Sequence, residues 1–203
     1  MQRGEKSERS RRLVLDAALR LFSKRGFRAT SVRDIADAAN VSTGNLYHHF
    51  PDKESIFRAL LDEYRAITGS EVFPFYRALR TGVFPDNIEQ LGYAARDSVR
   101  QFRPYMALIF VDVIEFDGTH IRDFYAHLAT RFAIVLNDPE SNITARVRPE
   151  VSAVSALQMV SRLFFNYFQL EILFGVPEPF GKDSTQIVHE IADMIRQGVA
   201  RRE

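Results

Sequence analysis

The sequence contains no cysteine and no tryptophan among its 203 residues. Without thiols, the chain can form neither structural disulfides nor thiolate metal sites, and this absence fits the cytoplasmic location that we expect. The longest apolar stretch, Met106 to Ile114, is broken by Asp112 and is too short to cross a bilayer. The N-terminal residues are charged and polar, unlike those of a signal peptide. We therefore expect no membrane association.

The sequence also lacks the short motifs that mark common enzyme classes. It has no Gly-rich phosphate loop and no nucleophile elbow, and a cysteine nucleophile is excluded. Any catalytic site would have to be assembled from scattered residues. We therefore expect a protein that is not an enzyme and that uses no cofactor.

Net charge is small, at +1, but it is unevenly distributed. Residues 1–60 carry 12 Lys and Arg against 7 Asp and Glu, whereas residues 61–203 carry 15 against 19. A basic end joined to a mildly acidic remainder suits a protein of which only one end meets phosphates. Because charged runs usually form solvated faces, this asymmetry only supports other evidence.

Residues 26–57 have the pattern of two short helices joined by a tight turn. Ser31 is a suitable N-cap for a helix over Val32–Ala39, whose apolar residues recur at helical spacing. Ser42 is a suitable cap for a second helix over Thr43–Phe50, which the following proline stops. This pattern predicts a helix-turn-helix, the motif that places a recognition helix in the DNA major groove.

This segment resembles the DNA-binding domain of TetR-type (TetR/AcrR family) transcriptional repressors. The family pattern appears as Val-Ser-Thr-Gly-Asn-Leu-Tyr-His-His-Phe over residues 41–50, followed by Asp-Lys-Glu at 52–54. The likeness includes the first helix, Arg12 to Lys24, and covers about a quarter of the chain. Beyond residue 60 only length and helical character agree.

The resemblance implies a role for individual residues of the motif. Asn45 is expected to bond an adenine edge and His48 the acceptors of guanine, whereas Tyr47 and Lys53 match positions that hold phosphates. The DNA-binding residues that we expect are Thr30, Ser31, Arg33, Ser42, Thr43, Gly44, Asn45, Tyr47, His48 and Lys53.

The whole chain reads as all-α, with about nine helices. We expect a helix-turn-helix domain over residues 1–52 and a helical ligand-binding and dimerisation domain over 53–203. Expected segments are a disordered arm at 1–7, helices at 8–25, 32–39, 43–50 and 52–67, a break at 69–76, helices at 85–102, 104–116 and 119–136, a polar loop at 137–149, and helices at 149–174 and 184–201.

The C-terminal part is rich in aromatic residues with interspersed polar groups. Most of these rings belong to a helical core, but together with polar tips they also suit an apolar ligand cavity of the kind the family's larger domain holds. The expected pocket residues are Phe102, Tyr105, Phe110, Asp112, Glu115, Phe116, His120, Phe124, His127 and Gln158.

The expected helix at 149–174 is apolar on nearly every side, which predicts burial on every side, partly against a second subunit. By resemblance, this helix and the amphipathic last helix pair with their copies across a two-fold axis. The expected interface residues are Phe164, Phe165, Phe168, Ile172, Ile187, Ile191, Met194 and Ile195.

Two groups of residues raise the question of a metal site. Adjacent side chains on a helix point about 100° apart, so His48 and His49 cannot both ligate one ion. His120, Asp123 and His127 recur on one helical face, but without a carboxylate from a third helix they fit a polar stripe or a pair of pocket donors better. We predict no metal.

These observations favour a homodimeric transcriptional repressor that a small apolar effector releases from a palindromic operator. A ligand-binding or protein-interaction module that has lost DNA binding is the alternative from another class, and a transcriptional activator with the same fold is also open. The sequence specifies neither the effector nor the operator.

Overall fold

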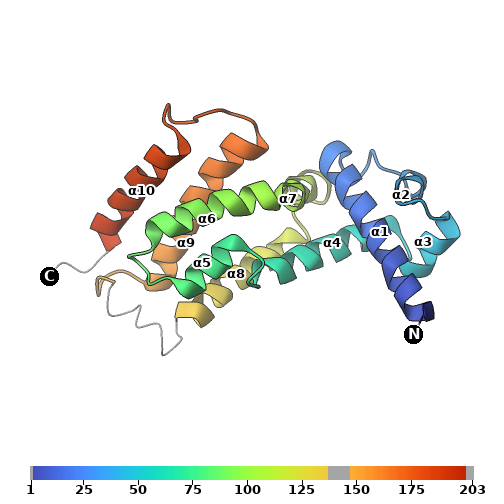
Figure 1. Cartoon of the computed structure of the whole chain (residues 1–203), viewed down its shortest axis with the longest axis horizontal. Helices are drawn as coiled ribbons and strands as arrows, with labels where there is room; N and C mark the ends of the chain where they lie inside the picture. Colours follow the sequence, from blue (N-terminus) through green and yellow to red (C-terminus); the bar gives the residue numbers. More distant parts are fainter. Residues whose placement is uncertain (1, 137–146, 200–203) are drawn as a thin grey trace. The chain divides into compact units, whose positions relative to one another are not determined.

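The structure, a computed structural model, describes residues 2–136 and 147–199. The expectation of an all-α protein is confirmed (Figure 1), and the ten α-helices of the described residues agree with the expected number. None of the helices in these residues combines the length and the apolar character that a membrane span requires. The polar loop expected at 137–149 lies mostly outside the described residues.

The chain forms two compact units that interleave in sequence. The first comprises residues 1–66 and 104–124, and the second comprises residues 67–103 and 125–203. Residues 104–124 thus belong to the same unit as the helix-turn-helix. The functional boundary that we expect between residues 52 and 53 stays a prediction.

The first unit is built around the N-terminal helices. These are α1 (Gln2–Arg25), α2 (Val32–Ala39), α3 (Thr43–His49), α4 (Lys53–Thr68) and α7 (Arg103–Glu115). Because α1 already begins at Gln2, the expectation of a disordered arm is wrong for residues 2–7. Glu, Lys and Arg favour helix strongly, and lengthening an existing helix costs little.

Aromatic rings form much of the core of this unit. Phe22 contacts Phe27 and Phe57, with ring centroids 5.4 and 5.7 Å apart. Phe116, just after α7, lies 4.7 Å from Phe27 and 5.0 Å from Phe57. The end of α7 is therefore packed directly against the helices that support α2 and α3.

The second unit contains the remaining helices, except that the first four residues of α8 belong to the first unit. These are α5 (Pro74–Thr81), α6 (Ile88–Gln101), α8 (Ile121–Leu136), α9 (Ala153–Phe168), the π-helix η2 (Gln169–Leu173) and α10 (Ser184–Val199). The sequence predicts a break at residues 69–76, but α5 begins at Pro74. A proline can interrupt a helix or occupy its first turn, and here it occupies the first turn. The long helix expected at 149–174 is wrong in its extent, since α9 starts at Ala153 and changes to π-helix after Phe168.

A glycine allows three helices of the second unit to approach closely. A Cβ added to Gly92 of α6 would lie 2.8 Å from the ring of Phe164 on α9 and 2.9 Å from Val188 on α10. Phe164 and Val188 are both fully buried. These contacts fix α6, α9 and α10 as one packed core.

Candidate nucleic-acid interface

The helix-turn-helix is defined by local hydrogen bonds that the sequence predicts. Ser31 caps α2 by accepting a hydrogen bond from the backbone N–H of Asp34, whose carboxylate accepts from the N–H of Ser31 in return. Asn40 ends α2 in the left-handed conformation, with φ of 54°. Ser42 then caps α3 through the N–H of Asn45. These bonds fix the turn between the two helices.

Helix α3 has one buried and one exposed face. Leu46 is buried completely, and Phe50, at the end of the helix, is nearly so. Around the rest of the helix Thr43, Gly44 and His48 are exposed, together with Tyr47, of which 53% is accessible. This exposed row consists of four of the residues expected to contact DNA, and apolar packing holds it in place from behind.

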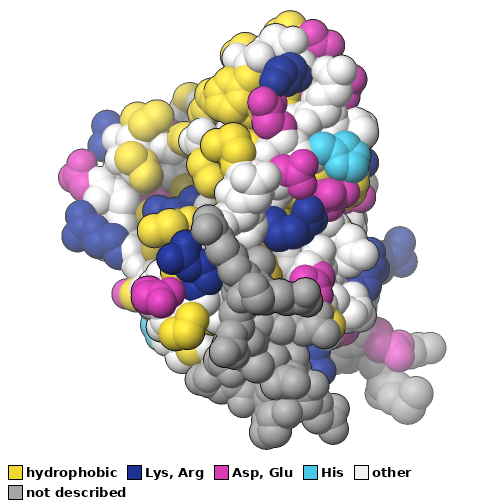
Figure 2. Space-filling view, turned by 90° about the vertical axis from the view of Figure 1, so that its left-hand side faces the viewer, with side chains coloured by type: hydrophobic (Ala, Val, Ile, Leu, Met, Phe, Trp, Pro, Cys, Tyr) yellow, Lys and Arg dark blue, Asp and Glu magenta, His cyan; other side chains and the backbone are white. Residues whose placement is uncertain are grey.

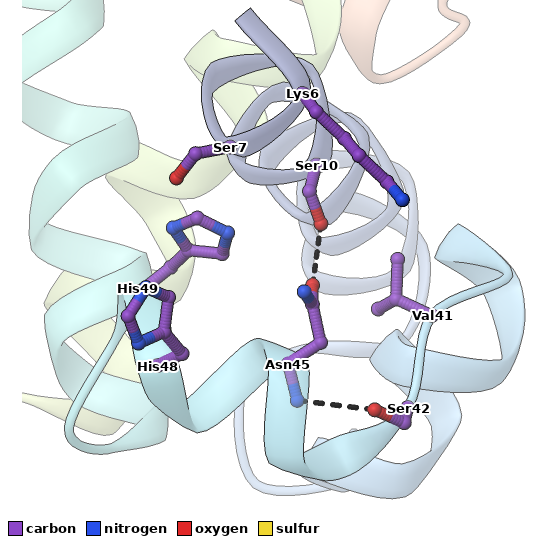
Figure 3. A pocket seen from close by; sticks show the side chains of 8 residues that line it. All are labelled: Lys6, Ser7, Ser10, Val41, Ser42, Asn45, His48 and His49. Carbon is purple, nitrogen blue, oxygen red and sulfur yellow. Dashed lines mark hydrogen bonds between the residues drawn. The ribbon is translucent and has the colours of Figure 1, made fainter. Parts of the chain in front are cut away.

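Asn45 lies at the edge of this row rather than fully in it. Its side chain is half-buried, and the hydroxyl of Ser10 on α1 donates a hydrogen bond to its carbonyl oxygen Oδ1. Figure 3 shows the two side chains pointing toward each other across a groove between α1 and α3. The groove has a volume of about 440 Å³ and is lined by Lys6, Ser7, Ser10, Val41, Ser42, Asn45, His48 and His49. No local pattern indicates the contact between Ser10 and Asn45, because it joins residues 35 positions apart.

His49 lies on the inner side of the same groove. Its Nε2 atom is buried and makes no hydrogen bond. Burial first, and then the neighbouring charges of His48 and Arg11, lower the pKa of His49 below its usual value. His49 therefore favours the neutral form, whereas His48 is exposed toward solvent.

Lys53 supports the loop that precedes α2. Its ammonium donates hydrogen bonds to the carbonyl oxygens of Phe27, at 2.9 Å, and Thr30, at 2.8 Å. It also lies 4.2 Å from the centre of the Phe27 ring. Burial lowers the pKa of Lys53. In this geometry Lys53 first stabilises the loop, and direct phosphate binding by its ammonium stays a prediction.

The other expected DNA-binding residues near α2 occupy different environments. Thr30 is buried, and its hydroxyl donates to the carbonyl oxygen of Gly26 at 2.8 Å. Its side chain therefore points inward rather than toward a phosphate. Arg33 is exposed, and its partner among the residues that the structure describes is Asp37, in a long ion pair of 3.9 Å. Of these two residues, only Arg33 presents its side chain to a partner.

The polar residues expected to orient a ligand are instead bonded within the first unit. Asp112 is fully buried, and its carboxylate contacts Nδ1 of His120 at 2.6 Å and accepts a bond from the N–H of Ile121 at 2.9 Å. Nε2 of His120 lies 3.6 Å from the carboxylate of Glu54 on α4. Asp112 and His120 therefore have partners within the first unit, and their polarity alone does not indicate a ligand.

Glu115 closes the loop between α1 and α2. Its carboxylate accepts hydrogen bonds from the backbone N–H of Phe27, at 2.9 Å, and of Arg28, at 2.6 Å. The carboxylate lies over Gly26 and would meet a Cβ added there. The φ of Gly26, 84°, is also a conformation that glycine adopts readily. Glu115 and Lys53 thus hold the same loop, one through its N–H groups and the other through its carbonyls.

The aromatic residues expected in the pocket do not form one cluster. Phe116 packs in the core of the first unit, and Tyr105 and Phe124 each stack on Tyr64. In the second unit Phe102 packs on Phe73. The remaining candidates differ in exposure: Phe110 and Gln158 are half-buried, and His127 is exposed. Of the expected set, therefore, Phe102 and Gln158 are the covered residues of the second unit.

The residues expected at a subunit interface also divide into two groups. Phe164, Phe168 and Ile187 are buried inside the second unit, so they cannot also face a partner. Within the single chain α9 is not covered on every side, because Met159 and Leu163 are 65% and 50% exposed, and the expected burial of this face against a second subunit stays a prediction. Phe165, Ile172, Ile191 and Ile195 are half-buried.

Met194 on α10 is 70% exposed and is the expected interface residue most accessible to a partner. Figure 2 shows hydrophobic side chains lying among charged ones on the face it views.

Among the described residues, no three His, Asp or Glu side chains are arranged to hold a metal ion.

Comparison with known proteins places the likeness at the helix-turn-helix. Residues 14–60 match the family model described as bacterial regulatory proteins, tetR family. The transcriptional repressor KstR2 of Rhodococcus jostii (strain RHA1) is 54% identical over 28% of this chain and 32% of its own. KstR2 of Mycobacterium tuberculosis is 41% identical over 38% of this chain and 42% of its own. The chain thus matches less than half the length of these relatives.

Solved structures extend the likeness to the whole fold. That of the ketosteroid transcriptional regulator KstR2 of Mycobacterium tuberculosis covers 95% of both chains, with 21% identity and a TM-score of 0.60. A TetR family regulator from Marinobacter aquaeolei VT8 covers 100% of both chains, with 18% identity and a TM-score of 0.68. With the helix-turn-helix geometry, these matches show that residues 14–60 are similar to the tetR family of bacterial regulatory proteins and that the chain shares the fold of the solved regulators.

Proposed function

We propose that this protein is a DNA-binding transcriptional repressor whose helix α3 enters the major groove. The observation that carries the proposal is the exposed row of Thr43, Gly44, Tyr47 and His48 on a capped helix. A packed, rigid back and an exposed polar front suit a helix that reads base edges. The similar repressors support the direction of regulation.

Charge supports the same face. The first 60 residues have a net charge of +5, from 12 basic and 7 acidic side chains. Lys6 lies in the groove next to α3, so a cation is available beside the exposed row. Phosphate contacts of this kind give affinity and orientation, whereas the side chains of α3 give the choice of sequence.

We further propose that two copies act together on a palindromic operator. Met159 and Leu163 lie one turn apart on α9 and are exposed, as is Met194 on α10. Exposed apolar side chains of this size favour burial against a partner. A two-fold symmetric pair would present two copies of α3 to half-sites related by the same symmetry.

The proposed effector is a small apolar molecule bound in the second unit. An aromatic cluster there joins α5, α6, α8 and α9 through close ring contacts, and its members are Phe73, Phe75, Phe102, Phe132 and Phe165. Such a cluster suits apolar ligands if helices separate slightly to admit them. The effector must favour a conformer that binds DNA less tightly, because otherwise it changes nothing.

Selection from a pool of randomised DNA duplexes tests the proposal. We expect the full-length protein to enrich one sequence composed of two inverted half-sites. Transcription in vitro from a promoter that carries this sequence should fall when the protein is added. If no sequence is enriched at moderate salt, the proposal of sequence-specific DNA binding is contradicted. If transcription rises when the protein is added, the protein is an activator instead.

A further inference from the structure

The contact between Ser10 and Asn45 bears on which base the recognition helix reads. Ser10 on α1 donates its hydroxyl hydrogen to Oδ1 of Asn45 on α3, and both side chains are half-buried (Figure 3). Within the part of the chain that the structure describes, this is the hydrogen bond that the Asn45 side chain makes. Its amide nitrogen Nδ2 therefore keeps two N–H donors for another partner.

An asparagine reads adenine by using both ends of its amide. Oδ1 accepts from the adenine N6 amino group while Nδ2 donates to N7. The hydroxyl bonded to Oδ1 takes one of its two lone pairs and orients the amide plane, so Oδ1 is less available to the adenine amino group while both N–H donors of Nδ2 stay available. The donors that remain match a base edge that offers acceptors only, and guanine presents two, O6 and N7, in the major groove.

We propose that Ser10 is a positioning residue that sets Asn45 to read guanine rather than the adenine expected from the sequence. This inference rests on the proposed function, since it assumes that α3 lies in the major groove. It goes beyond that function because it assigns part of the base preference to α1, a helix outside the helix-turn-helix.

The test is base selection from randomised duplexes by the full-length protein and four variants. Asn45→Ala identifies the position in the enriched sequence that depends on Asn45. Ser10→Ala removes the hydroxyl, and Ser10→Thr retains it. Ser7→Ala is the matched control, because Ser7 lines the same groove and its side chain makes no hydrogen bond in the described structure. Thermal unfolding of each variant shows whether the fold is intact.

We expect the wild type to prefer guanine at the position that depends on Asn45. Ser10→Ala should change the ratio of guanine to adenine there by about fivefold or more in favour of adenine, whereas Ser10→Thr and Ser7→Ala keep the wild-type ratio. A change in affinity equal for all sequences would reveal a merely structural role and would overturn the proposal.

Two further outcomes separate this inference from the function on which it rests. An unchanged base ratio in a folded Ser10→Ala variant that still selects DNA overturns the inference and leaves the proposed function intact. If the wild type selects no sequence at all, the proposed function fails first, and the assignment of Ser10 fails with it.

Discussion

At the scale of single residues, two side chains that the sequence assigns to DNA contacts make hydrogen bonds within the protein instead. Lys53 was expected to hold a phosphate, and its ammonium instead bonds two backbone carbonyls of the loop before α2. Thr30 turns its hydroxyl inward to Gly26. Ser31 and Ser42, in contrast, cap α2 and α3 as predicted.

The difference has a physical reason. A cap bonds a backbone group three residues away, so its identity and spacing are visible in the sequence. The bonds of Lys53 and of Glu115 join residues that are 26 and 88 positions apart. Such contacts depend on how helices pack, and no local pattern encodes them.

Replacing Lys53 by methionine tests its role in the loop. The carbonyl oxygens of Phe27 and Thr30 lose their donor, so the free energy of unfolding should fall by about 1–3 kcal/mol. Denaturant unfolding measures this loss. Lys24→Met is the control, because Lys24 is exposed on α1 and has no ion pair or hydrogen bond in the described structure. Equal stability of the two variants would contradict the loop-holding role.

At the scale of elements, the end of α7 is tied to the loop between α1 and α2. Glu115 accepts two backbone N–H bonds from that loop, and Phe116 packs into the aromatic core beside it. The sequence assigned both residues to a ligand pocket. Polar and aromatic residues in a sequence do not distinguish a ligand pocket from a contact between α7 and the loop, since both place buried polar groups among aromatic rings.

Replacing Glu115 by glutamine tests this tie. The carboxylate loses its charge and one of its two acceptor oxygens, so the bonds to Phe27 and Arg28 weaken. We expect the backbone amides of Phe27 and Arg28 to exchange hydrogen several-fold faster, and stability to fall by about 1–2 kcal/mol. Hydrogen exchange read by NMR at single residues measures the first effect.

Asp117→Asn is the matched control, because it makes the same carboxylate-to-amide change two residues away. Asp117 has a φ of 53°, a conformation that asparagine also accepts. Exchange at Phe27 and Arg28 that stays at the wild-type rate in Glu115→Gln would show that Glu115 does not hold the loop.

Sequence patterns predicted the element boundaries best where helices have strong stop and start signals. Helix α2 spans the predicted residues, and α3 ends one residue before the predicted Phe50. Helix α5 was missed because a proline at its first turn looks the same in sequence as a proline in a break. The switch from α9 to a π-helix after Phe168 changes only the hydrogen-bond register, which hydrophobic spacing does not reveal.

At the scale of the whole molecule, the helical fold and the resemblance to the tetR family could be predicted from the sequence, but the assembly surface could not. Apolar side chains are typical of both the core of a subunit and the interface between subunits, so the composition of α9 does not distinguish the two. The structure separates them: Phe164 and Phe168 are fully buried, whereas Met159 is exposed. A charge at Phe164 would therefore unfold the subunit rather than test its association.

The double change Met159→Glu and Met194→Glu tests the proposed pairing of two copies. Both side chains are exposed, so the charges should be tolerated in the subunit and weaken association by at least tenfold. Sedimentation equilibrium measures the association constant. Val72→Glu is the control, because Val72 is 60% exposed and precedes α5. A wild type that is monomeric at micromolar concentration would rule out the two-copy operator model.

The exposed row of α3 should meet DNA, and the salt dependence of DNA binding tests this role. Fluorescence anisotropy gives the affinity of the wild type, Tyr47→Ala and Tyr125→Ala for the selected duplex and an unrelated one. Tyr47 is 53% exposed on α3, and Tyr125 is 43% exposed on α8.

We predict that Tyr47→Ala lowers the binding affinity for both duplexes by a similar factor, about fivefold or more. The reason is that it removes a phosphate contact rather than a base contact. Tyr125→Ala should bind as the wild type does, and all affinities should fall steeply as salt rises. Equal affinities for the wild type and Tyr47→Ala at every salt concentration would contradict the claim that this face of α3 meets DNA.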